Sequence, residues 1–234
     1  MQKSLKKYLI LTVLFLIGIV PLKSQGNLPY YDDRPIHFGF LLGLNTMDFG
    51  VELSHLQMEN GETYLAEVSS LMPGFTAGII SDLRLSRYFN LRFTPSIHFS
   101  ERKLTYRVAG ATEKETENVF SIPLTLPLHL KYSAERLHNF RPYLLAGGGA
   151  YLDFGRDKER NVLLKPFDYY VEFGTGCDIY FPFFKFAPEL KFAIGFNNML
   201  TPVSQRDSGG FEPQYTNAIS KLTTKMLTLS FNFE

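Results

Sequence analysis

The chain has 234 residues, a formal charge of +1 and a single cysteine, Cys177. It is long enough to bury a core within one domain. Phe and Tyr make up 15% of the residues and Trp is absent, a composition that favours strands over helices and argues against a helical bundle. The balanced charge leaves no basic tail for nucleic acid, and a lone cysteine excludes a disulfide framework.

The first segment has the pattern of a secretory signal peptide. Three lysines precede a short apolar run over residues 8–20, and residues 21–25 are suited to processing. We predict a signal peptide over residues 1–24, whose removal takes away four lysines and no acids and leaves a formal charge of −3. Residues 25–35 are polar and contain two prolines, so we expect a short extended periplasmic segment there.

After the signal, no apolar run approaches the roughly 20 residues of a membrane-spanning helix. The stretch FKFAPELKFAIGFN, residues 184–197, instead alternates strictly: aromatic or other apolar residues at even positions, charged residues, Gly and Ala at odd positions. Only a strand places alternate side chains on opposite faces. A large aromatic face opposite a charged one is typical of a narrow barrel with lipid outside and a polar interior.

The same alternation recurs along the chain and predicts eight strands. In order, they fall near residues 36–45, 74–85, 91–99, 120–132, 143–154, 168–181, 184–197 and 225–234. Long polar loops at residues 57–73, 107–118, 155–166 and 199–221 alternate with short connections. We therefore predict an all-β fold, an eight-stranded antiparallel transmembrane β-barrel of the outer-membrane type over residues 36–234, with both chain ends and the short turns periplasmic. Such a barrel is filled by its own side chains, so we expect no diffusion pore.

Two features fit this pattern less well. The alternation reverses between Asn45 and Met47, which predicts a bulge in one long strand or a tight turn into an extra strand. Pro123 and Pro127 each remove a ladder donor from the fourth strand, although the alternation continues through both.

Inward-facing charges predict ion pairs inside the barrel. Pairing the second and third strands about Arg87 places Asp82 opposite Arg92. We interpret this as a structural pair that neutralises the interior.

A two-residue turn at residues 181–182 makes the same prediction for the next hairpin. In that register Asp178 opposes Lys185 and Glu172 opposes Lys191, while Glu189 also faces inward. These charges could form a gated proton path, but matched charges that fill a polar interior are the commoner use.

Aromatic residues gather near the short turns, as expected for an interfacial girdle. They are Tyr88, Phe89, Tyr132, Phe140, Tyr143, Phe181 and Phe183. Cys177 is expected to face lipid and to be inert.

Two runs resemble a known family. NLPYYDDRPIHFGFLLG, residues 27–43, followed by Asn45 to Asp48, is similar to the amino-terminal region of the PorT (SprT) family of Bacteroidetes outer-membrane proteins. SIPLTLPLHLKY, residues 121–132, resembles a strand of the wider OmpX-like eight-stranded barrels. The resemblance implies a component of the type IX secretion system, which exports cargo proteins and supports gliding motility in some species. It also implies that other components of that system are partners, beside the outer-membrane bilayer.

No motif indicates catalysis, a cofactor or a metal. His37, His98 and His129 face inward without the close spacing of metal ligands, and interior hydrogen bonding is their expected role. A lipid-modifying barrel enzyme would need outward Ser, His and acidic groups, whereas the outward faces here are Phe, Leu and Ile. We therefore expect no enzyme activity, no cofactor, no nucleic acid and no small-molecule substrate. A secretion accessory and a general OmpX-like barrel for adhesion or surface stability remain the two alternatives.

Overall fold

The computed structural model describes residues 27–54, 64–68, 72–108, 114–155, 161–206 and 212–234. The predicted signal peptide and the charged run at residues 156–160 of the third loop lie outside the described residues. The described part of the chain contains no helix long and apolar enough to cross a membrane.

Strands dominate the described residues. They are β1 (Ile36–Leu53), β2 (Tyr64–Val68), β3 (Met72–Arg84), β4 (Phe89–Phe93), β5 (Ser96–Val108), β6 (Lys114–Ser121), β7 (Pro123–Ser133), β8 (Phe140–Asp153), β9 (Phe167–Tyr180), β10 (Lys185–Gly195) and β11 (Ile219–Phe233). Three short helices accompany them: η1 (Tyr31–Asp33), η2 (Val203–Gln205) and α2 (Pro213–Asn217).

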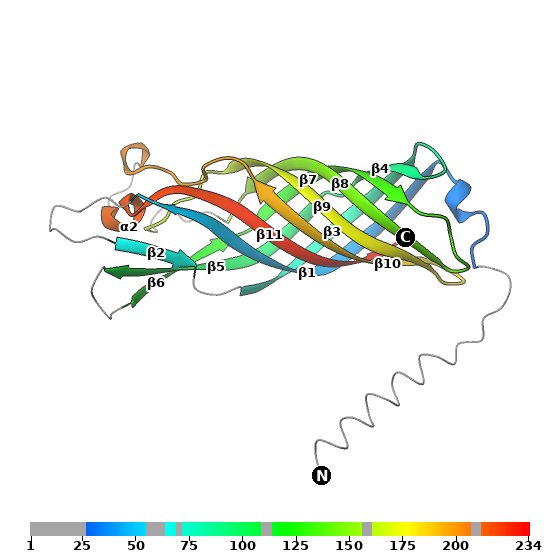
Figure 1. Cartoon of the computed structure of the whole chain (residues 1–234), viewed down its shortest axis with the longest axis horizontal. Helices are drawn as coiled ribbons and strands as arrows, with labels where there is room; N and C mark the ends of the chain where they lie inside the picture. Colours follow the sequence, from blue (N-terminus) through cyan, green and yellow to red (C-terminus); the bar gives the residue numbers. More distant parts are fainter. Residues whose placement is uncertain (1–26, 55–63, 69–71, 109–113, 156–160, 207–211) are drawn as a thin grey trace, which may run out of the picture.

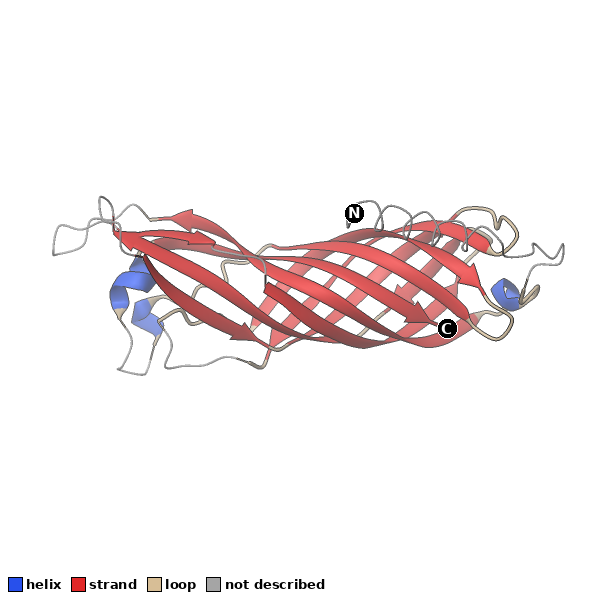
Figure 2. Cartoon of the chain, turned by 90° about the horizontal axis from the view of Figure 1, so that it is seen from below, coloured by secondary structure: helices blue, strands red, loops and turns tan. Residues whose placement is uncertain are grey.

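Antiparallel pairing joins the strands into a ring, as predicted. From β1 the ladder runs through β11, β10, β9, β8 and β7 to β4 and β3, and β3 pairs with β1 over twelve residue pairs. The strands cross the molecule obliquely around one axis (Figures 1 and 2). β4 with β5, and β6 with β7, each continue in one register, so each pair forms one interrupted strand of the ring, and β2 pairs with β5 without adding a strand to it. The described residues therefore form a ring of eight continuous or interrupted strands, the number predicted from the sequence, and we call each of them a stave.

The break between β4 and β5 within one stave follows from local chemistry. In the register shared by both strands Thr94 lies opposite Pro127 and Pro95 opposite Leu126, and neither proline can donate a hydrogen bond. The Pro95 carbonyl still accepts from the Ile79 backbone N–H at 3.0 Å. The prolines therefore interrupt the ladder without changing its register, which explains why the alternation continues through Pro127.

The predicted bulge or extra turn after Asn45 is wrong. β1 is continuous, and its pairing with β11 keeps one register from Phe40 to Glu52. What changes is polarity: Met47 and Phe49 point inward and are buried, while Asp48 lies on the outer face. From Met47 onward polar residues occupy the outer face and apolar side chains fill the interior, as in a soluble sheet. We call this part of the barrel, made of β2, β6 and the adjoining ends of β1, β5 and β11, the extension.

The extension lies at the end of the barrel opposite η1 (Figure 1). Parts of the predicted long loops are strands here, because β2 and β6 both pair with β5. α2 and η2 belong to the fourth predicted loop. An apolar core fills the extension, with Met47, Phe49, Leu104, Tyr106 and Leu222 among its most buried members.

The outer face of the remaining barrel is an apolar band. Its large exposed side chains come from every stave and include Phe38, Phe40, Leu44, Ile79, Phe99, Leu128, Leu144, Phe173, Leu190, Leu227 and Leu229. Of the aromatic residues predicted near the short turns, Tyr143 is an exception, because it is 3% exposed and faces the interior. We refer below to the outward residues as the apolar band.

Candidate functional site in the barrel interior

The barrel interior gathers the charged residues singled out in the sequence. All seven are at most 5% exposed: Asp82, Arg92, Glu172, Asp178, Lys185, Glu189 and Lys191. Ions buried this deeply must be paired and hydrogen-bonded to be tolerated. Their partners therefore decide what the interior can do.

Arg92 is the centre of a charged cluster in the half of the interior nearer the short turns. Asp82 lies opposite it in the β3–β4 ladder, and the Arg92 Nε donates to Asp82 Oδ2 at 2.8 Å. The two terminal nitrogens donate to Glu189 Oε2 at 3.1 Å and to Glu234 Oε1 at 2.9 Å. One guanidinium thus joins three carboxylates from β3, β10 and the residue after β11, using the planar geometry that only Arg provides.

The register predicted for the β9–β10 hairpin is wrong by two residues. Four residues, Phe181 to Phe184, separate the strands, so Lys185 pairs with Tyr180 and Ala193 with Glu172. A shift of two keeps every side chain on its predicted face but changes its neighbour.

The predicted partners in this hairpin therefore lie diagonally instead of opposite one another. Lys185 Nζ is 3.9 Å from Asp178 Oδ1, and Lys191 Nζ is 3.9 Å from Glu172 Oε2. Both acids have closer partners from other staves.

Those closer partners are residues that the sequence did not single out as pairs. Lys131 Nζ donates to Asp178 Oδ2 at 2.7 Å, and His129 Nε2 lies 2.6 Å from Glu172 Oε2. Lys185 Nζ lies 2.7 Å from Glu234 Oε2, and Tyr143 donates to Glu189 at 2.7 Å. The alternation of β7 predicts that His129 and Lys131 face inward. Their partners lie on β9, which is not a neighbouring strand, so the pairs can be identified only from the closed barrel.

A second polar layer lies next to this cluster, on the side of the extension. His98 lies 2.9 Å from Thr76 Oγ1 through Nδ1 and 3.0 Å from Thr125 Oγ1 through Nε2. Closer to the extension, Arg102 donates to Ser121 and Tyr151 at 2.8 Å each. Arg102 also packs 4.3 Å from the centre of the Phe49 ring, so it joins the polar interior to the apolar core of the extension.

The third inward histidine lies at the opposite end. His37 Nε2 is 2.8 Å from the Tyr31 carbonyl, and the two rings stack at 4.7 Å. The described residues contain no group of three or more His, Cys, Asp or Glu side chains arranged to hold a metal ion.

Residues 27–35 cover the mouth of the barrel at the short-turn end, and we call them the N-terminal strap. The strap is not extended as predicted, because η1 folds it back over the mouth (Figure 1). Asn27 donates to the Tyr180 carbonyl at 2.9 Å, and Asp32 Oδ1 accepts from the Tyr180 hydroxyl at 2.7 Å. Burial on this inner face raises the pKa of Tyr31 to about 12.

The strap also forms ion pairs and a backbone hydrogen bond with residues at or next to the short turns. Arg84 donates to Asp33 at 2.9 Å, while Arg136 donates to the Leu28 carbonyl at 3.1 Å. Asp32 lies 3.5 Å from Arg141. The inner face of the strap is thus fixed to the barrel, whereas Tyr30, at 79% exposure, points away from it.

The sequence profile of the family described as "Outer membrane protein beta-barrel domain" matches residues 23–201. The chain belongs to this family. The family match and the fold together establish an outer-membrane β-barrel protein, with the apolar band facing the bilayer. No curated protein matches the sequence.

Three solved structures of small outer-membrane proteins are similar to the chain. Neisserial surface protein A is 10% identical with a TM-score of 0.41, and the match covers 85% of this chain and 98% of that one. OprG from Pseudomonas aeruginosa is 12% identical with a TM-score of 0.45, covering 84% and 92%. AlkL, solved in lipid bilayers, is 14% identical with a TM-score of 0.41, covering 92% and 95%.

One interior glycine is expected to be essential to the charged cluster. Gly147 lies between His129 and Glu172 in adjacent ladders, and a Cβ there would lie 2.0 Å from the Leu128 carbonyl oxygen. We expect Gly147→Ala to lower the free energy of unfolding by about 2 to 3 kcal/mol, because backbone atoms must separate. Urea unfolding in detergent micelles measures this.

Gly50→Ala is the matched control for Gly147→Ala. At Gly50 a new Cβ would meet side-chain atoms only, with Thr223 Oγ1 at 2.4 Å and the end of Lys225 at 3.3 Å and beyond. Thr223 can change rotamer at the cost of its hydrogen bond to Gly50, so we expect a loss of no more than about 1 kcal/mol. Equal stability of the two variants would contradict the interpretation.

Proposed function

We propose that the protein is a non-catalytic accessory or assembly factor of the type IX secretion system, and that it binds a periplasmic partner through the N-terminal strap. The observation that carries the proposal is the position of this segment. Residues 27–43 bear the resemblance to the PorT family, and their first part lies across the periplasmic mouth. The alternation of the strands alone would fit any small barrel.

The geometry of the strap supports a binding role. Its inner face is held by hydrogen bonds to Tyr180 and Arg136, while Tyr30 and Arg34 are exposed on the outer face. A segment with one fixed and one exposed face presents a preorganised surface, which reduces the entropy lost on binding. The interior supports the non-catalytic part, since its charges bind one another.

Gene deletion tests the proposal. We expect cargo proteins to accumulate in the periplasm of the deletion strain and export to return with the wild-type gene. Complementation with a Tyr30→Ala/Arg34→Glu variant should leave cargo in the periplasm although the barrel assembles, as judged by its heat-modifiable mobility on gels. Lys221→Glu, at an exposed position on β11 at the opposite end of the barrel, is the control and should restore export.

A second candidate is a general barrel for adhesion or surface stability. It is favoured by the extension, in which β2, β5 and β6 project beyond the apolar band and residues of β5 and β6 join a separate apolar core. Normal cargo export in the deletion strain, together with reduced adhesion or detergent resistance, would support this function and exclude the first.

A further inference from the structure

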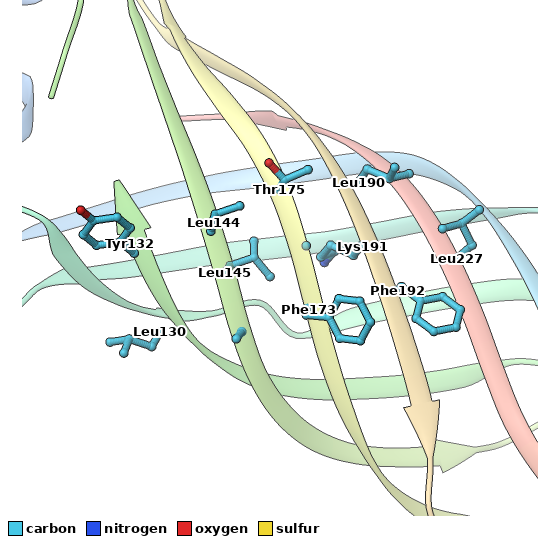
Figure 3. Close-up of a pocket in the computed structure, with 12 residues that line it drawn as sticks. Leu130, Tyr132, Leu144, Leu145, Phe173, Thr175, Leu190, Lys191, Phe192 and Leu227 are labelled. Carbon is cyan, nitrogen blue, oxygen red and sulfur yellow. The ribbon is translucent and has the colours of Figure 1, made fainter. Parts of the chain in front are cut away.

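The apolar band is hollowed on one side of the barrel. A depression of about 680 Å³ lies across β7 to β11 (Figure 3). Outward residues form its rim and walls: Leu130, Tyr132, Leu144, Ala146, Phe173, Thr175, Leu190, Phe192 and Leu227. Three residues on the inward faces of β8, β9 and β10 also line it: Leu145, Gly174 and Lys191. We call this depression the β8–β9 groove.

Strand register explains the groove. Ala146 pairs with Phe173, and Thr175 pairs with Leu144, so two small side chains lie diagonally next to each other on the outer face. On the far side Phe173 packs edge-on against Phe192, with ring centres 5.5 Å apart, and forms a wall. The opposite wall consists of leucines from β7 and β8.

The chemistry of the lining selects an apolar occupant. Among the outward residues only Tyr132 and Thr175 carry a polar side-chain atom, and the Thr175 hydroxyl already donates to the Tyr143 carbonyl at 3.2 Å. Lys191 also lines the groove, but it is 5% exposed and its Nζ lies 3.6 Å from Glu189 Oε1 inside the barrel. Tyr132 lies one residue before the end of β7 at the short-turn side, the depth at which tyrosines meet lipid headgroups. The groove is continuous with the apolar band, and therefore with the surface that already contacts the bilayer.

We propose that the β8–β9 groove binds one acyl chain of a phospholipid from the periplasmic leaflet, with its headgroup near Tyr132. A chain seated in the groove contacts side chains on two sides, whereas a chain on the convex wall contacts one. This site is independent of the proposed role in secretion.

The absence of tryptophan provides a clean test, because a single introduced Trp is the only indole in the chain. Leu144→Trp reports from the groove, and Leu42→Trp reports from an outward position on β1. Each full-length variant is held in detergent micelles and titrated with phosphatidylethanolamine whose acyl chains are dibrominated, which quenches a Trp that they contact. The quenching curve yields the binding constant of lipid relative to detergent at each position.

We expect a relative constant of about 5 at Leu144→Trp and of about 1 at Leu42→Trp. Adding Ala146→Phe to Leu144→Trp fills the groove and should return its constant to about 1. Adding Ala77→Phe, a matched substitution on the outer face of β3, should leave it unchanged. The folding of each variant is checked by heat-modifiable mobility.

Two outcomes would overturn the proposal. Equal constants at the two positions, or no effect of Ala146→Phe, would show that the groove binds lipid no better than the convex wall. Quenching at Leu144→Trp that falls as the protein-to-lipid ratio rises, while quenching at Leu42→Trp holds, would assign the groove to a second copy of the chain.

Discussion

Replacing Arg92 by methionine is expected to lower the free energy of unfolding by about 3 to 5 kcal/mol, since buried carboxylates lose their shared cation. The loss is unequal among the three acids. Glu234 keeps Lys185 at 2.7 Å, and Glu189 keeps Tyr143 at 2.7 Å, but Asp82 is left with Asn90 alone. Urea unfolding in micelles or vesicles, followed by gel mobility, measures the change.

Arg84→Met is the matched control for Arg92→Met. Its guanidinium lies 2.9 Å from Asp33, nearly the Arg92–Asp82 distance, but the two side chains are 29% and 66% exposed. Water screens this pair, so we expect a loss of no more than about 1 kcal/mol. Adding Asp82→Asn to Arg92→Met should recover part of the stability. Similar losses at the two arginines would show that burial does not set the value of the pair.

The sequence predicted the faces of the strands well wherever they cross the bilayer. Lipid on the outside and a sealed interior impose one polarity on alternate residues, so Phe38 and Phe40 could be assigned outward without a structure. Beyond the bilayer this rule reverses. Met47 and Phe49 are buried in the interior although they are apolar. The assumption that apolar residues always face outward therefore predicts a bulge between Asn45 and Met47, where β1 keeps one register.

Contacts inside the barrel were less predictable than faces. Hairpin partners depend on turn length, and two extra residues in the turn at Phe181 to Phe184 moved Lys185 and Lys191 away from their predicted neighbours. Pairs that cross several staves, such as Arg92 with Glu189, depend on the tilt and closure of the barrel. Glu234 continues the inward alternation of β11, so its face was predictable although its partners were not.

The outcome for Lys191→Glu follows from those partners and not from the predicted register. Lys191 Nζ lies 3.6 Å from Glu189 Oε1 and 3.9 Å from Glu172 Oε2, so the substitution places a third carboxylate between two others. Repulsion in a buried site is poorly screened, and removing the attraction alone costs about 3 to 5 kcal/mol. Because total stabilities are about 5 to 15 kcal/mol, we expect no heat-modifiable folded band for Lys191→Glu.

The neutral variant Lys191→Gln separates lost attraction from added repulsion, and it should assemble with reduced resistance to urea. Lys221→Glu is the exposed counterpart, because Lys221 lies 3.5 Å from Glu52 and the two side chains are 41% and 65% exposed. Solvent screening should keep its effect within about 1 kcal/mol. Normal assembly of Lys191→Glu would mean that water or counterions reach the interior cluster, and the barrel would then have to be regarded as open to solvent at this level.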